Sequence, residues 1–300
     1  MCSAKCAAAI LLLIALSRAA AADWPEGYEV YKDTQSPDGR YGILVPTYEA
    51  WDNDSTLEEK NYFADLQNHR LLGKIAGADY FENQNHRSLR VVWAEGSSWC
   101  IVQYDSRFGF DTISIIEPNA TSFIQTDIGK KIDKALTAVI AKQSHEKADG
   151  GGDASPYFRI VKQTVEVRVV STTDPKQLNV EHANFALFYG TYDLNSKKWL
   201  SANARPVSFD EYDMSDSAFG DIDKDLEQNS FANDDDKLSW LDERMNGVYT
   251  MARLMLPAAR FAAVKQEQIK WLKQRDAATS VQQKSEMLIA RIKVLQELLW

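Results

Sequence analysis

Short apolar stretches, separated by turn residues, fill the chain from about residue 28 to residue 207. They are rich in aromatic and β-branched side chains and lie at 41–45, 89–93, 99–104, 112–116, 165–170, 185–192 and 199–200. The intervening sequences include Ser36-Pro37-Asp38-Gly39, Glu95-Gly96-Ser97 and Asn195-Ser196. Side chains of the first kind favour strands, and Gly, Pro, Asn and Asp favour turns. The pattern predicts a β-rich domain over residues 23–207.

One helix is expected to interrupt these strands. Apolar residues recur at intervals of three and four, at Ile128, Ile132, Ala135, Leu136, Val139 and Ile140. Asp127 stands where a side-chain cap would begin the helix. The glycine-rich residues 148–153 that follow are predicted to form a flexible loop.

Residues 208–236, here called the acidic segment, have a different composition. They contain eleven acidic side chains and a single base, Lys224. Such a composition is typical of a solvated linker. Asp221, Asp223 and Asp225 alternate as in a calcium loop, but Leu226 and Ala232 stand where that loop needs glycine and glutamate. We therefore favour a solvated linker over a calcium site.

Helical spacing returns over residues 237–300. Leu241, Met245 and Val248 mark a first helix, and Pro257 is expected to open a second. The third has an apolar repeat at Leu288, Ile292, Leu295 and Leu299. The predicted fold class is thus α+β: a β-rich N-terminal domain with one helix, an acidic linker and a small three-helix unit.

The first 22 residues have the pattern of a signal peptide. A basic Lys5 precedes an apolar run over 7–16, and Ala20 and Ala22 form a small-x-small cleavage site. Export to the periplasm or the medium follows, with an uncleaved anchor as the alternative. Losing Lys5 and Arg18 changes the formal net charge from −9 to −11. This argues against nucleic acid or anionic lipid as a partner, and favours a neutral or basic one.

Motifs of known catalytic chemistry are absent from the sequence. It has no nucleophile elbow, phosphate loop or dinucleotide fingerprint, and its four histidines lack the spacing of zinc ligands. We expect no cofactor and no metal. Cys100, between Trp99 and Ile101, is predicted to be a small buried hydrophobe rather than a redox or intermolecular thiol. A pair of catalytic carboxylates has no local spacing, so an envelope carbohydrate-active hydrolase stays open as an alternative.

Asn-His-Arg triplets occur twice, each before a predicted strand. They contain His69 and His86. We interpret them as polar turns, with a shared sugar- or carboxylate-binding edge as the alternative.

Two segments resemble the start of a β-propeller blade of the TolB or WD-like kind. These are Ser36-Pro37-Asp38-Gly39-Arg40-Tyr41 and, more degenerate, residues 93–99. Blades take about 40 to 45 residues, and the predicted helix interrupts the repeat. The resemblance implies blade-like antiparallel meanders rather than a closed propeller.

A second resemblance lies in the C-terminal helices. Its two patterns are Asp242-x-x-Met245-Asn246-x-x-Tyr249 and Gln268-x-x-Trp271-x-x-x-Arg275-Asp276. They resemble the LprI-like lysozyme inhibitor family of small exported bacterial proteins, which often has leucine at the place of Met245 and a cysteine at the place of Thr279. The resemblance implies an exported binding protein that inhibits lysozyme or another cell-wall hydrolase. A non-catalytic interaction scaffold is a further alternative.

The motif also has a purely structural interpretation. Gln268, Trp271 and Arg275 share one helix face, so Arg275 can stack on Trp271 while Asp242 or Asp276 accepts its hydrogen bonds. The alternative is direct contact with a protein partner. Residues 236–300 contain eleven basic and seven acidic side chains. Lysozymes are basic, so the acidic segment is better suited to attract one.

Overall fold

A computed structural model describes residues 24–54, 60–77, 79–143, 153–174, 176, 178 and 180–300. The predicted signal peptide and most of the predicted glycine-rich loop lie outside these residues. The chain divides into two compact units, Met1–Lys130 and Lys131–Trp300, called here the first and second unit. This boundary replaces the one predicted after residue 207. The reason is that the C-terminal helices share a core with the sheet that precedes them.

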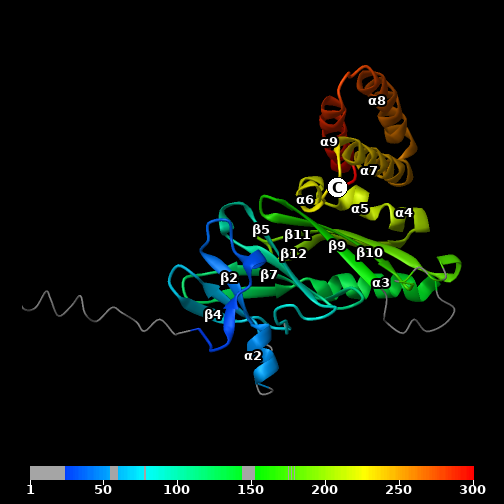
Figure 1. Ribbon diagram of the computed structural model, residues 1–300. Helices are drawn as coiled ribbons and strands as arrows, with labels where there is room; N and C mark the ends of the chain where they lie inside the picture. The colour runs from blue at the N-terminus through cyan, green and yellow to red at the C-terminus, as the bar shows by residue number, and fades with distance from the viewer. Residues whose placement is uncertain are drawn as a thin grey trace, which may run out of the picture. The chain divides into compact units, whose positions relative to one another are not determined.

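The first unit contains two four-stranded antiparallel meanders. One has the order β1 (Tyr28–Val30), β2 (Tyr41–Pro46), β3 (Tyr62–Asp65) and β4 (Arg70–Lys74). The other has the order β5 (Ser88–Trp93), β6 (Cys100–Asp105), β7 (Phe110–Pro118) and β8 (Phe123–Asp127). In Figure 1 they are the blue and the cyan to green strands. Short helices lie between strands: η1 (Lys32–Thr34), α2 (Tyr48–Asn53) and η2 (Glu95–Ser97).

A single apolar core joins these two sheets. It takes Ile43, Phe63 and Leu72 from the first meander and Leu89, Val102 and Ile116 from the second, among others. Because both sheets contribute to the cluster, they pack against each other. Cys100 belongs to the same core and is fully buried, as predicted. Burial raises the pKa of its thiol well above the ordinary value.

Helix α3 (Gly129–Gln143) confirms the predicted helix. The Asp127 carboxylate accepts a hydrogen bond from the backbone N–H of Lys130 at 3.1 Å, so the predicted cap is also confirmed. Ile128, Ile132, Leu136 and Ile140 are the buried face.

The second unit contains most of α3 and, after it, a third antiparallel sheet. Its strands are β9 (Asp153–Val161), β10 (Thr164–Thr172), β11 (Phe185–Asp193) and β12 (Lys198–Pro206), in the order β12-β11-β10-β9. The short η3 (Val180–His182) precedes β11. Gly190 in β11 is required by packing, because an added Cβ would lie 2.7 Å from the Ser201 carbonyl oxygen of β12.

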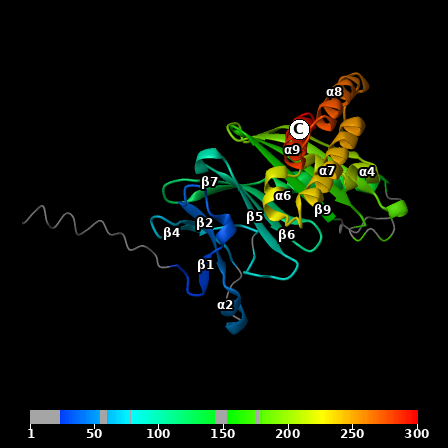
Figure 2. The ribbon, with the colours of Figure 1, turned by 45° about the horizontal axis from the view of Figure 1, so that its top comes forward.

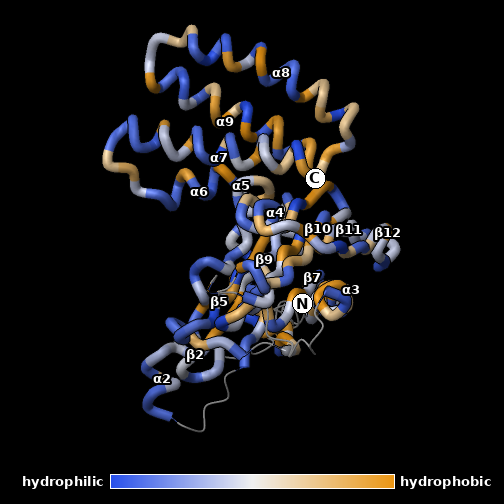
Figure 3. The backbone as a smooth tube through the Cα atoms, turned by 90° about the vertical axis from the view of Figure 1, so that its right-hand side faces the viewer, coloured by the Kyte–Doolittle hydropathy of each residue, from blue (hydrophilic) through white to orange (hydrophobic). Residues whose placement is uncertain are grey.

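Helices cover this sheet in two layers. The first is formed by α4 (Phe209–Asp213), α5 (Ser215–Phe219) and α6 (Ile222–Gln228). The second is formed by α7 (Asp234–Met255), α8 (Ala258–Asp276) and α9 (Val281–Glu297). Figures 1 and 3 show the first layer between the sheet and the second layer. Figure 2 shows α6 alongside α7.

The acidic segment is therefore folded, and the predicted solvated linker is wrong. Three of its apolar residues, Ala218, Phe219 and Ile222, are buried in one core with Val170 and Leu187 of the sheet and with the C-terminal helices. Side-chain caps fix the helix starts: Ser208 and Glu211 form a capping box at α4, and Asp221 caps α6. Burial of a small apolar set outweighs the acidic composition.

The expected α+β class and the β-rich N-terminal part are confirmed, with antiparallel meanders in both units. None of the helices in the described part of the chain combines the length and the apolar character that a bilayer crossing requires.

Candidate functional site

The structure brings most of the predicted motif residues together between α7 and α8. The Arg275 guanidinium contacts the Asp242 carboxylate of α7 at 2.8 Å and the neighbouring Asp276 carboxylate at 3.0 Å. It also lies over the Trp271 ring, 5.6 Å from the ring centroid. The predicted stacking and both predicted acceptors are confirmed. This cluster ties the end of α8 to α7.

Gln268 occupies the buried middle of the same helix face. Its side-chain N–H donates to the Met245 sulfur at 3.2 Å, and its carbonyl oxygen accepts from Arg291 of α9 at 2.7 Å. Burial lowers the pKa of Arg291 below the ordinary value of a guanidinium. Gln268 thus links α8 to both α7 and α9, so its role is structural.

Two motif residues of α7 lie apart from this cluster. Asn246 is exposed. The ring of Tyr249 packs on Phe261 at 5.4 Å between centroids, near the connection from α7 to α8. Figure 3 shows α8 with mixed hydrophobic and hydrophilic positions, and Val264 and Gln268 are its only buried residues among those described.

Replacing Trp271 by alanine is expected to lower the unfolding free energy of the second unit by about 1–3 kcal/mol. The indole is only partly buried, so the cost stays below that of a fully buried aromatic. Trp271→Phe should retain most of the stability because a ring remains beneath Arg275. Urea unfolding followed by far-UV circular dichroism measures the difference. If Trp271→Ala unfolds like the wild type but no longer binds a partner, the side chain is a contact residue instead.

The three alternating aspartates of the acidic segment have separate tasks. Asp221 caps α6, Asp223 pairs with Lys293 at 2.7 Å, and Asp225 pairs with Arg244 at 2.7 Å. Within the described residues, no group of three or more His, Cys, Asp or Glu side chains converges as metal ligands would.

The two histidine triplets form turns, as predicted. His69 and His86 have positive φ values of 46° and 60°. Such values are uncommon for residues other than glycine and are typical of tight turns. The His69 ring lies 5.4 Å from the Trp24 ring.

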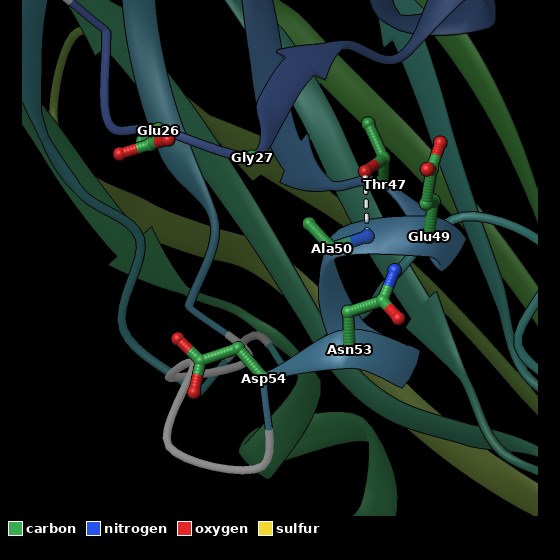
Figure 4. Close-up of a pocket in the computed structure, with 7 residues that line it drawn as sticks. All are labelled: Glu26, Gly27, Thr47, Glu49, Ala50, Asn53 and Asp54. Atoms are coloured by element: carbon green, nitrogen blue, oxygen red, sulfur yellow. Dashed lines mark hydrogen bonds between the residues drawn. The ribbon is translucent and has the colours of Figure 1, made fainter.

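One pocket of the first unit lies beside α2 and has a volume of about 450 Å³. Figure 4 shows its lining residues, which come from α2 and the segment before β1. Thr47 caps α2 by accepting a hydrogen bond from Ala50 at 3.1 Å. Gly27 has φ +77°, and a Cβ there would lie 2.6 Å from the Ala50 Cβ. None of the lining residues is a buried polar group without a partner.

A second pocket of the first unit, called here the Tyr104 pocket, has a volume of about 310 Å³. Its lining is almost entirely polar and consists of Gly77, Asp79, Tyr80, Arg87, Ser88, Tyr104, Asp105 and Asp111. A β-bulge builds one wall: Tyr104 pairs with Thr112 and Asp105 with Phe110, so Asp111 stands outside the ladder. Bulges of this kind redirect a side chain.

The carboxylates of this pocket differ in their surroundings. The Asp105 carboxylate accepts hydrogen bonds from the Ser88 hydroxyl at 2.8 Å and from the Gln103 side chain, and it forms an ion pair with Arg90 at 3.3 Å. Asp79 and Asp111 are exposed. Burial raises the pKa of the Tyr104 phenol well above its ordinary value, and the negative charge of Asp79 adds to the rise.

Sequence reasoning missed the Tyr104 pocket. Its residues come from four segments with no common spacing, and only the Asn-His-Arg turn before β5, which provides Arg87, drew attention to one of them. Compared with models of protein families and with curated protein sequences, the chain shows no match to either.

Proposed function

We propose that this protein is an exported bacterial binding protein that inhibits lysozyme or another cell-wall hydrolase. An N-terminal segment with the pattern of a signal peptide supports export. The resemblance of the α7 and α8 motif to LprI-like inhibitors supports the class of target. The observation that carries the proposal is the exposed acidic surface formed by the acidic segment.

Nine of the eleven acidic side chains of this segment are exposed. The other two serve the fold: Glu211 pairs with Arg205 at 2.6 Å, and Asp225 pairs with Arg244 at 2.7 Å. Because the segment folds into α4, α5, α6 and the start of α7, its charges are held on an ordered surface. An ordered surface loses less entropy on binding than a flexible tail would.

Charge also distinguishes this surface from α8. Helix α8 contains five basic and two acidic side chains. A basic hydrolase would be repelled by α8 and attracted by the acidic segment. We therefore assign the first contact with the target to the acidic segment and a scaffolding role to the motif residues Asp242, Gln268, Trp271, Arg275 and Asp276. Binding alone occludes the carboxylate cleft of the target, so the inhibitor needs no catalytic group.

The mature chain from Asp23 onward, at micromolar concentration, is expected to slow the clearing of bacterial cell walls by lysozyme. Calorimetry should show binding that weakens as salt is added, because screening reduces attraction between exposed charges. Unchanged hydrolysis together with no heat of binding, for lysozyme and for other cell-wall hydrolases of the host, contradicts the proposal.

A charge variant tests the assigned surface. Asp213→Asn, Glu227→Gln and Asp235→Asn together remove three exposed charges that form no ion pair among the described residues. The association rate with lysozyme should fall, while the dissociation rate changes little. The matched control carries Asp52→Asn, Glu95→Gln and Glu181→Gln, which remove three exposed charges elsewhere. Equal rates for the two triple variants would contradict the assignment.

A further inference from the structure

The Tyr104 pocket contains a buried hydroxyl group without a hydrogen-bond partner among the described residues. The Tyr104 side chain is only 4% exposed. Its neighbours in β6, Cys100 and Val102, lie in the apolar core, to which Tyr104 also belongs, and Tyr104 lines the polar pocket at the end of the strand. A buried hydroxyl left unpaired is costly, and most such groups in folded proteins have a partner. A ligand in this pocket would supply one.

Two carboxylates of the same pocket are available to a ligand. Within the described part of the chain, no hydrogen bond or ion pair engages the side chains of Asp79 and Asp111. The single base of the lining, Arg87, donates to the Asp79 backbone oxygen at 3.1 Å. The third carboxylate, Asp105, is already occupied by three donors. The available groups are therefore acceptors and carry negative charge.

Hydrogen bonds hold the described residues on either side of Asp79. The Gln125 side chain accepts from the N–H of Ala76 and donates to its carbonyl oxygen, both at 2.9 Å. Thr112 donates to the Gly77 carbonyl oxygen at 3.3 Å. On the other side, the buried Asn61 bonds both backbone groups of Tyr80, at 2.6 and 3.1 Å. Binding to a wall held in this way costs little ordering entropy.

The chemistry of these groups selects a class of ligand. An ammonium group has three N–H donors and one positive charge, which suits two carboxylates and a phenol oxygen. The volume of about 310 Å³ is at the lower end for small-molecule pockets. A divalent metal ion fits less well, because the described residues hold no convergent set of three ligating side chains. We propose that the Tyr104 pocket binds a small organic cation that carries a primary ammonium group, held by Asp79, Asp111 and the Tyr104 hydroxyl.

Calorimetry and thermal shift on the full mature chain test this proposal with matched probes. Butylammonium and 1,5-diaminopentane should bind and raise the unfolding temperature, whereas butanol and butyrate should do neither. Equal effects of amine and alcohol, or no amine binding at millimolar concentration, would overturn the proposal. Binding of Ca²⁺ or Mg²⁺ that displaces the amine would overturn it in favour of a metal site.

Two variants identify the contacts. Tyr104→Phe removes only the unpaired hydroxyl, so the protein should fold with unchanged or higher stability and bind the amine about tenfold more weakly. Asp79→Asn keeps the shape, removes the charge and should weaken binding at least as much. Asp52→Asn, an exposed residue of α2, is the control and should bind like the wild type. Wild-type amine affinity in a folded Tyr104→Phe or Asp79→Asn variant would overturn the assignment.

Discussion

Replacing Arg244 by alanine is expected to destabilise the second unit by about 3–5 kcal/mol, the usual cost of leaving a buried charge without its partner. The Arg244 side chain is 5% exposed and contacts the Asp225 carboxylate at 2.7 Å. It also donates to the Asp216 backbone oxygen at 3.2 Å and lies over the Trp240 ring. Alanine would remove all these contacts and leave the half-buried Asp225 unpaired.

The size of this effect should depend on pH. Burial raises the pKa of Asp225, and the attraction of Arg244 only partly offsets the rise. The folded state therefore holds a proton on Asp225 more tightly than the unfolded chain, so ionisation of this group opposes folding as pH rises above about 4. Without Arg244 the offset disappears and the pKa rises further. The penalty of Arg244→Ala should thus be largest near neutral pH and shrink as the solution is acidified.

Urea unfolding of wild type and variant at several pH values measures this penalty. The double variant Arg244→Met with Asp225→Leu is the control, because it replaces the pair by apolar groups and leaves no buried charge. It should recover most of the stability. A loss below about 1 kcal/mol for Arg244→Ala, or a penalty that does not change with pH, would show that the pair contributes less than its burial suggests.

Local patterns predicted the elements that local chemistry determines. Short runs rich in aromatic and β-branched residues, bounded by turn residues, placed β2, β5, β6 and β7 within one or two residues at each end. The spacing of Ile128, Ile132 and Leu136 together with Asp127 placed α3 and its cap. In the same way, a separation of four residues on one helix placed the Arg275 guanidinium over Trp271.

The amino-acid composition of the acidic segment led to a wrong prediction, because the burial of a few apolar residues determines its structure. The acidic segment is hydrophilic on average over its residues, yet Ala218, Phe219 and Ile222 are buried in the core of the second unit. The helices did leave a local signal: Ser208 and Glu211 stand at the spacing of a capping box, and Asp221 precedes an apolar residue. Weighting such caps above net charge would have predicted helices here.

The Tyr104 pocket could not be predicted from spacing. Asp79 lies between the two meanders in the sequence. Its neighbours Ala76 and Tyr80 are held by Gln125 of β8 and by Asn61, which precedes β3. Asp111 enters the site because of a bulge, which depends on how β6 and β7 pair. Nonlocal pairing of this kind leaves no periodic trace in a single sequence.

Phe63→Ala is expected to lower the unfolding free energy of the first unit by about 3–5 kcal/mol, because it deletes a large aromatic side chain from a close-packed core. Phe63 is fully buried and contacts rings from both meanders: Tyr41 at 5.7 Å, Trp93 at 6.1 Å and Phe123 at 5.4 Å between centroids. Phe63→Leu keeps most of the volume and should cost less than about 1.5 kcal/mol.

Amide hydrogen exchange measures which strands and helices lose stability in the Phe63→Ala variant. Because the core of Phe63 is built from the first unit, Phe63→Ala should reduce protection in β2, β3 and β6. The helices α7 and α9 belong to the core of the second unit and should keep their protection. Two compact units with separate cores can open separately. Equal loss of protection in β3 and α9 would instead mean that the two units unfold as one cooperative body, and the boundary at residue 130 would then have no energetic meaning.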